Sequence, residues 1–219
     1  MAASWRNLAR PASVWRTIHG YLGAIRWKRG TPIVDRDGLR RFLESRSSFV
    51  TQISLYGYLR TRAGLRYPEL FSNDDFARAV DAAKWQMWLA CLSDLSVYAG
   101  GLLARRSRAD KPAIASLMGA MLEAILAANQ AGNDAAGADR VRTRLAQCDW
   151  ASVPDDATAF SESPRTLIEC APIVDQLKQL DDAIVRNSVR FRWQQVRREL
   201  RRDLDAEAVM ASQTPPPGA

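Results

Sequence analysis

The sequence predicts an all-α protein, an irregular helical bundle of five or six helices with a long C-terminal helix. Apolar residues recur at three- and four-residue intervals along most of the chain, the spacing of amphipathic helices. Hydrophobic residues make up 47% of the 219 residues, enough for a sizeable core. No alternation of apolar and polar residues is long enough to build a sheet. We expect a basic amphipathic segment over 1–34, a bundle domain over 35–210 and a disordered tail over 211–219.

The first 34 residues carry arginine and lysine but no acidic residue, a composition also typical of a mitochondrial presequence. At 100° per residue, 14–28 forms a helix with an aliphatic and aromatic stripe on one side and cations on the other. Interfacial helices combine these features, and tryptophan prefers the headgroup level. The expected membrane or partner contacts are Trp5, Trp15, Ile18, Leu22, Ile25, Arg16, Arg26, Lys28 and Arg29. The alternative is that the stripe docks on the protein's own bundle.

The next two helices are delimited by their capping residues. Apolar periodicity predicts a helix over 37–63, which begins at Asp35 or Asp37 and ends at Gly64. The stretch 66–71 contains a proline and is expected to be a turn. A cap within 72–74 then starts a third helix that reaches about Leu103.

The third helix is the most apolar part of the chain. Between Trp85 and Ala104 its one charged residue is Asp94. Its length would suffice to span a bilayer, but a carboxylate near the middle would cost about 2.5–3.5 kcal/mol on insertion scales. The sequence therefore predicts a buried core helix. A fourth helix over 110–130 has a wide apolar face interrupted by Glu123.

The C-terminal third predicts a loop over 131–139, a short basic helix over 140–150 and a linker over 151–164. Pro172 is expected to open a long helix that reaches about Met210. Such a helix would be longer than a small domain, so we expect its far end to project or to pack on another chain, as in a homodimer. Its expected seam is Leu177, Leu180, Ile184, Trp193, Val196, Leu200 and Leu204.

Several chemistries lack their usual residues. His19 is the only histidine, and there is neither a G-x-S-x-G elbow nor a glycine-rich phosphate loop. The three cysteines have no metal-ligand spacing, and their odd number favours a reducing, cytoplasmic compartment. The adjacent aspartate pairs lack the third aspartate that magnesium-dependent prenyl transfer uses. We therefore expect no metal and no cofactor, and the sequence favours a protein that is not an enzyme.

Two lone carboxylates within apolar runs, Asp94 and Glu123, are the candidates for a ligand pocket. A buried carboxylate must be paired, protonated or functional. Structural ion pairs with Arg60, Arg62 or Lys84 are one interpretation. The other is a pocket anchored by Asp94 and Glu123 and lined by Trp85, Trp88, Tyr56 and Tyr98.

An arginine cluster occupies 186–202, where seven arginines accompany one acid, Glu199. Phe191 and Trp193 lie between the cations, an arrangement that suits phosphates of RNA or of lipid headgroups. A solvated helix face is the alternative. The candidate anion-binding residues are Arg190, Arg197, Arg198, Arg201 and Arg202.

The block SLYGYLRTRAGLRYPELFSNDDFARAVDAAKWQMWLACLSDLSVYAGG, residues 54–101, resembles an uncharacterised family of short bacterial helical proteins, some loosely labelled esterase. The resemblance assigns no site residue, and an esterase conflicts with the missing nucleophile elbow. The leading hypothesis is an interaction or adaptor protein, cytoplasmic and peripheral to the inner membrane through its basic N-terminal helix. Nucleic-acid binding and a ligand-binding or enzymatic pocket are the alternatives.

Overall fold

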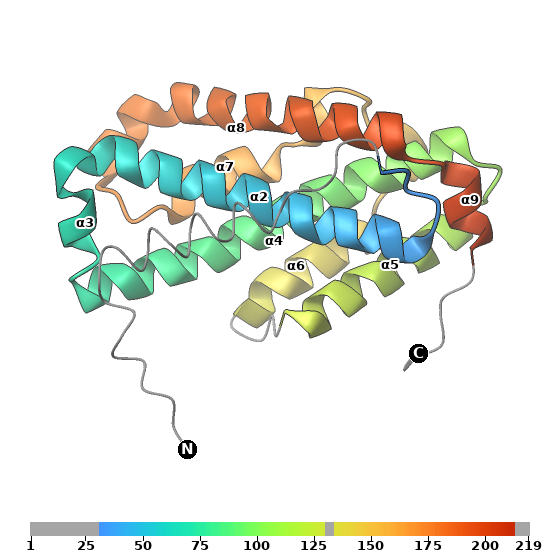
Figure 1. The fold of residues 1–219 in the computed structure, drawn as a ribbon, viewed down its shortest axis with the longest axis horizontal. Coiled ribbons are helices and arrows are strands. Elements are labelled where there is room, and N and C mark those ends of the chain that lie inside the picture. The colour runs from blue at the N-terminus through green and yellow to red at the C-terminus, as the bar shows by residue number, and fades with distance from the viewer. Residues whose placement is uncertain (1–30, 130–133, 213–219) are drawn as a thin grey trace, which may run out of the picture.

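The computed structural model describes residues 31–129 and 134–212, and this part of the chain is all-α with no strand (Figure 1). The predicted fold class is confirmed. The expected contacts at residues 5–29, part of the 131–139 loop and most of the C-terminal tail lie outside the described residues. The α-helices are α2 (Arg36–Ala63), α3 (Tyr67–Leu70), α4 (Asp74–Arg106), α5 (Lys111–Ala128), α6 (Ala135–Ala146), α7 (Glu162–Cys170), α8 (Asp175–Asp203) and α9 (Ala206–Ala211).

Helix α4 is the core of the bundle. It packs against α2, α5, α6, α7 and α9, and Figure 1 shows it running lengthwise beneath α2. Two described helices, α4 and α5, are long and apolar enough to cross a membrane by length and composition alone. In α4, however, 94% of the most apolar window is buried inside the fold. The prediction of a core helix is therefore confirmed, and Cys91 is a fully buried core residue of this helix.

Asparagine and aspartate side chains start most helices. Asp35 accepts a hydrogen bond from the Gly38 amide at 2.6 Å, and Asn73 and Asp110 cap α4 and α5 in the same i to i+3 geometry. Gly64 ends α2 with φ of 54°, a left-handed conformation that glycine adopts without strain. These boundaries match the sequence prediction within about three residues.

The structure corrects three other boundaries. The expected turn over 66–71 contains the 3₁₀ turn Gly64–Arg66 and then the short helix α3. The basic helix starts earlier than predicted, at Ala135, because Asp134 accepts from the Gly137 amide and caps it. A further helix, α7, begins at Glu162 near the end of the expected linker, runs beyond it to Cys170, and packs on α4 and α8.

The C-terminal helix is also shorter than predicted and does not project. Helix α8 begins at Asp175, three residues after Pro172, and ends at Asp203. At 1.5 Å per residue its 29 residues extend for about 44 Å, and they lie along α2 and α7 of the same chain. A break at Leu204 separates it from α9.

The break is made by the N-terminal end of the described chain. The Ile33 amide donates to the Asp203 carbonyl at 2.7 Å, and the Asp205 amide donates to the Ile33 carbonyl at 3.0 Å. This parallel bridge between Ile33 and Leu204 takes up backbone groups that would otherwise continue the helix. Ile33 is fully buried. The bridge therefore places the first described residues at the C-terminal end of α8.

Candidate functional site

Asp94 lies at the centre of the bundle and joins three helices. Its carboxylate accepts from the Arg144 guanidinium of α6 at 2.8 Å. It also accepts from the backbone amides of Glu162 at 3.2 Å and Ser163 at 2.8 Å, which form the first turn of α7. These amides have no partner within α7, and Ser161 makes no side-chain capping bond. A carboxylate from α4 therefore caps α7 across the core.

The same network extends to α8 through Ser163. The Ser163 hydroxyl donates to Asp94 at 2.7 Å and accepts from the indole N–H of Trp193 at 2.9 Å. Trp193 in turn stacks on Phe160, with ring centroids 4.6 Å apart. Asp94, Ser163 and Trp193 are all buried. The network thus satisfies polar groups that would be costly to bury alone.

The burial of this network decides what it can do chemically. Burial raises the pKa of Asp94 above its ordinary value of 3.8, while the charge of Arg144 and the Ser163 donors act in the opposite direction. Ser163 lies beside a carboxylate, but its hydroxyl is closed off from solvent and no histidine occurs among the described residues. The arrangement fits a structural cap and gives no support to an esterase site.

Glu123 does not share a pocket with Asp94. It lies on the outer side of α5, where it accepts from Arg142 of α6 through both carboxylate oxygens at 2.7 and 2.9 Å. The hydrogen bond from Arg142 lowers the pKa of Glu123 below its ordinary value of 4.5. The expected partners were wrong: Arg62 pairs with Asp181, and the charge partners of both carboxylates come from α6. Sequence reasoning missed these pairs because the two arginines lie 19 residues from Glu123 and 50 residues from Asp94, on a separate helix.

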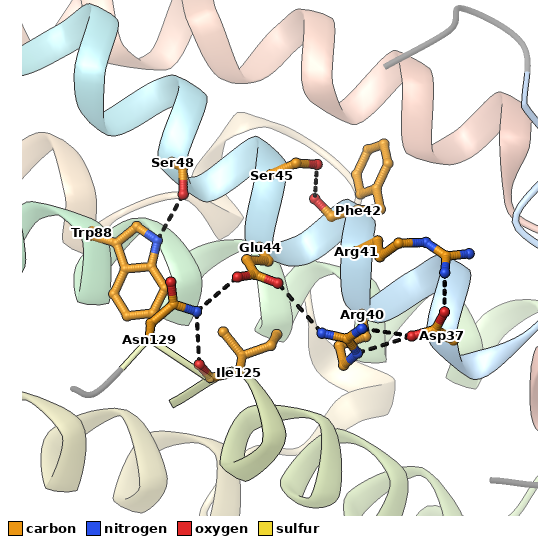
Figure 2. Close-up of polar contacts among 10 residues, drawn as sticks. All are labelled: Asp37, Arg40, Arg41, Phe42, Glu44, Ser45, Ser48, Trp88, Ile125 and Asn129. Atoms are coloured by element: carbon orange, nitrogen blue, oxygen red, sulfur yellow. Dashed lines mark hydrogen bonds and ion pairs between the residues drawn. The ribbon is translucent and has the colours of Figure 1, made fainter. Parts of the chain in front are cut away.

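The four aromatic residues expected around Asp94 point elsewhere. Trp88 donates from its indole N–H to Ser48 of α2 at 3.1 Å, and Figure 2 shows it between α2 and the end of α5. Trp85 contacts Trp88 edge to face. Tyr98 donates to Asp155 at 2.8 Å, and Tyr56 of α2 lies near the charges of Lys84 and Asp81, more than two turns of α4 from Asp94. The predicted aromatic pocket is therefore not assembled by these residues.

Polar contacts beside Trp88 fasten α2 to its neighbours. Glu44 accepts from the Asn129 side-chain amide at the end of α5, at 2.8 Å. Figure 2 shows the same row continuing through Arg40 to Asp37. This row of side chains is internally paired, which fits a structural role.

A groove of about 1170 Å³ lies over α4 between α6 and α7. Its charged lining is balanced, with three arginines (Arg140, Arg144, Arg165) and three acids (Asp139, Glu162, Glu169). The guanidinium of Arg144 is occupied by Ser93 and Asp94. Among the described residues no three His, Cys, Asp or Glu are grouped to hold a metal ion. The groove shows no set of convergent polar groups that would define a ligand class.

Helix α8 carries the most distinctive surface, and two of the seven residues of its predicted seam lie on that surface. Trp193, Val196, Leu200 and Leu204 are buried as expected, but Leu180 and Ile184 are 75% and 73% exposed. The reason is Asp181, which is buried in an ion pair with Arg62 and a hydrogen bond from Tyr58 of α2. Because the Asp181 side chain faces the bundle, the side chains of Leu180 and Ile184 face away from it.

The outward side of α8 is both apolar and free of acids. Phe191 is 69% exposed, and at 100° per residue it lies within about 40° of Leu180 and Ile184 around the helix. We call the following residues the outer face of α8; all are exposed and none is acidic: Leu180, Ala183, Ile184, Asn187, Phe191, Gln194, Gln195, Arg198, Arg201 and Arg202. Apolar residues occupy its first half and arginines its second half.

The candidate anion-binding arginines are only partly available. Arg201 pairs with Asp155 at 3.4 Å, and Arg202 with Asp203 at 2.7 Å. Arg197 is half-buried, with its charge near Asp156 and Tyr98. Arg190 and Arg198 are exposed and make no ion pair with a described residue. The cluster therefore retains cations without carboxylate partners.

Searches against protein-family models, curated proteins and solved structures find no match for this chain. The resemblance noted for residues 54–101 therefore stays a prediction. The site must be interpreted from its own residues.

Proposed function

We propose that this chain is a non-enzymatic interaction protein that binds an anionic membrane surface from the cytoplasmic side. The observation that carries the proposal is the backbone bridge between Ile33 and Leu204. Because of this bridge, segment 1–30 joins the bundle beside the end of α8 that carries arginines. This places the attachment point of one cationic segment and a second cationic cluster, about 170 residues apart in the sequence, at one end of the bundle. An anionic surface would satisfy both of them.

Lipid suits this arrangement better than nucleic acid because of the aliphatic residues. The sequence pattern predicts that Ile18, Leu22 and Ile25 share one stripe of a helix within segment 1–30, which also carries tryptophans, residues that favour the headgroup region. Aliphatic side chains make few favourable contacts with a phosphate backbone, which is bound chiefly by charge. The buried, fully bonded Asp94 network supports a scaffold more than a reaction centre.

Vesicle flotation of the full chain tests the proposal. Vesicles of phosphatidylcholine with phosphatidylglycerol should carry the protein at low salt, and vesicles of phosphatidylcholine alone should carry much less. Replacing Ile18, Leu22 and Ile25 with glutamine should abolish flotation. Leu65→Gln is the matched control, because Leu65 is 99% exposed on the turn after α2, outside segment 1–30. Absence of flotation with anionic vesicles, or retardation of RNA with no flotation, would refute the proposal.

A further inference from the structure

We infer that the outer face of α8 is a second membrane contact, with Leu180, Ile184 and Phe191 entering the headgroup region of an anionic bilayer. The inference rests on the proposed function and identifies a described surface that would take part in it. It starts from exposure: three large apolar side chains, each about 70% exposed, are aligned on one helix. Isolated exposed apolar residues are ordinary, but an aligned set flanked by cations marks an interaction surface.

The dimensions of the face suit an interfacial helix. From Leu180 to Phe191 the rise is about 16 Å, three turns of helix in which no residue of the outer face is charged. The arginines follow at Arg198, Arg201 and Arg202, within about three further turns. A helix lying in the interface buries its apolar side shallowly and places its cations at the phosphates. The outer face of α8 has this division along its length.

The first alternative is that segment 1–30 covers the outer face of α8. The described chain begins beside Leu204, which is about 20 Å along the helix from Phe191. Charge opposes this. The segment contributes Arg26, Lys28 and Arg29 near its root and no acid, and it would lie against the arginines of α8. The cations of the two surfaces repel each other, whereas both surfaces are attracted to a negatively charged bilayer.

A second copy of the chain is the other alternative. Two outer faces packed in parallel would again oppose arginine-bearing surfaces that lack acids, and packed antiparallel they would join only their apolar halves. Three apolar side chains from each copy also make a small contact compared with the roughly 1,200–2,000 Å² that stable interfaces bury. Charge and size therefore favour lipid over self-association.

The test compares the full chain with a triple variant, Leu180→Gln, Ile184→Gln and Phe191→Gln. All three sites are exposed, so circular dichroism should show an unchanged fold. Affinity for phosphatidylcholine–phosphatidylglycerol vesicles should fall about tenfold or more, since each removed side chain loses apolar burial. Leu65→Gln should leave affinity unchanged. Arg198→Gln should weaken binding at low salt, while Arg78→Gln, which removes an exposed arginine of α4, should not.

Three results would overturn the inference. If the intact chain floats and the triple variant floats equally well, the face is not a membrane contact, although the proposed function survives. If the intact chain sediments as a dimer and the variant as a monomer with unchanged vesicle affinity, a second copy covers the face. The third result concerns the melting temperature measured without vesicles. If it falls in the triple variant and in the variant of Ile18, Leu22 and Ile25, and combining the two sets of substitutions lowers it by less than the sum, segment 1–30 covers the outer face of α8. Failure of the intact chain to float would refute both proposals together.

Discussion

Replacing Asp94 with alanine should cost a large part of the stability of the fold. The substitution leaves the backbone N–H groups of Glu162 and Ser163 without an acceptor. A buried donor left unsatisfied costs about 1–3 kcal/mol, and two of them give about 2–6 kcal/mol. Arg144 adds little, because its side chain is 26% exposed and can turn toward water. We expect a loss of about 4 kcal/mol, against typical stabilities of about 5–15 kcal/mol.

Urea unfolding followed by tryptophan fluorescence measures this loss. Asp94→Asn is an informative companion, because it keeps one acceptor oxygen and should cost about half as much. Hydrogen exchange adds a local readout: the first-turn amides of α7 should lose protection in Asp94→Ala before the rest of the bundle does. An Asp94→Ala protein within 1 kcal/mol of the wild type, by the range above, would refute the view that this carboxylate caps α7.

Three further predictions follow from the same structure. Glu123→Gln should cost under about 1 kcal/mol at neutral pH. Because the folded pKa of Glu123 is lowered, this contribution is present above its ordinary value of 4.5 and should vanish as pH falls through the folded value; a difference that persists at pH 2 would contradict it. Gly100→Ala should lower the melting temperature, since a Cβ there would overlap the Trp150 ring, and an unchanged melting curve would show that the ring can move. Burial raises the pKa of Cys170 to about 12 and that of Cys91 further, so both thiols should resist iodoacetamide at pH 7 until urea unfolds the protein, as mass spectrometry would show.

Local signals predicted the helices of the first half well. The caps at Asp35, Asn73 and Asp110 and the left-handed Gly64 are each determined by a few neighbouring residues. The core role of α4 also follows from local composition, because a helix that is apolar all round must be buried.

Features fixed by distant residues were not predictable in the same way. Helix α7 has only a short apolar pattern, and its first turn depends on Asp94, which is 68 residues away from Glu162. The break after α8 depends on Ile33, about 170 residues earlier. The exposure of Leu180 and Ile184 depends on a buried partner for Asp181 in α2. The periodicity of apolar residues does not reveal such contacts between residues that are far apart in the sequence.

A fluorescent probe of membrane depth, attached to the outer face of α8, shows directly whether an anionic bilayer covers this face, as we infer. Asn187 lies on this face between Ile184 and Phe191, so Asn187→Cys can carry an environment-sensitive dye in a chain whose two partly exposed cysteines, Cys148 and Cys170, are replaced by serine. With phosphatidylglycerol-containing vesicles at low salt, we expect the dye emission to shift to shorter wavelength and to become shielded from aqueous iodide. Emission and quenching that stay the same while the protein floats with those vesicles would contradict the claim.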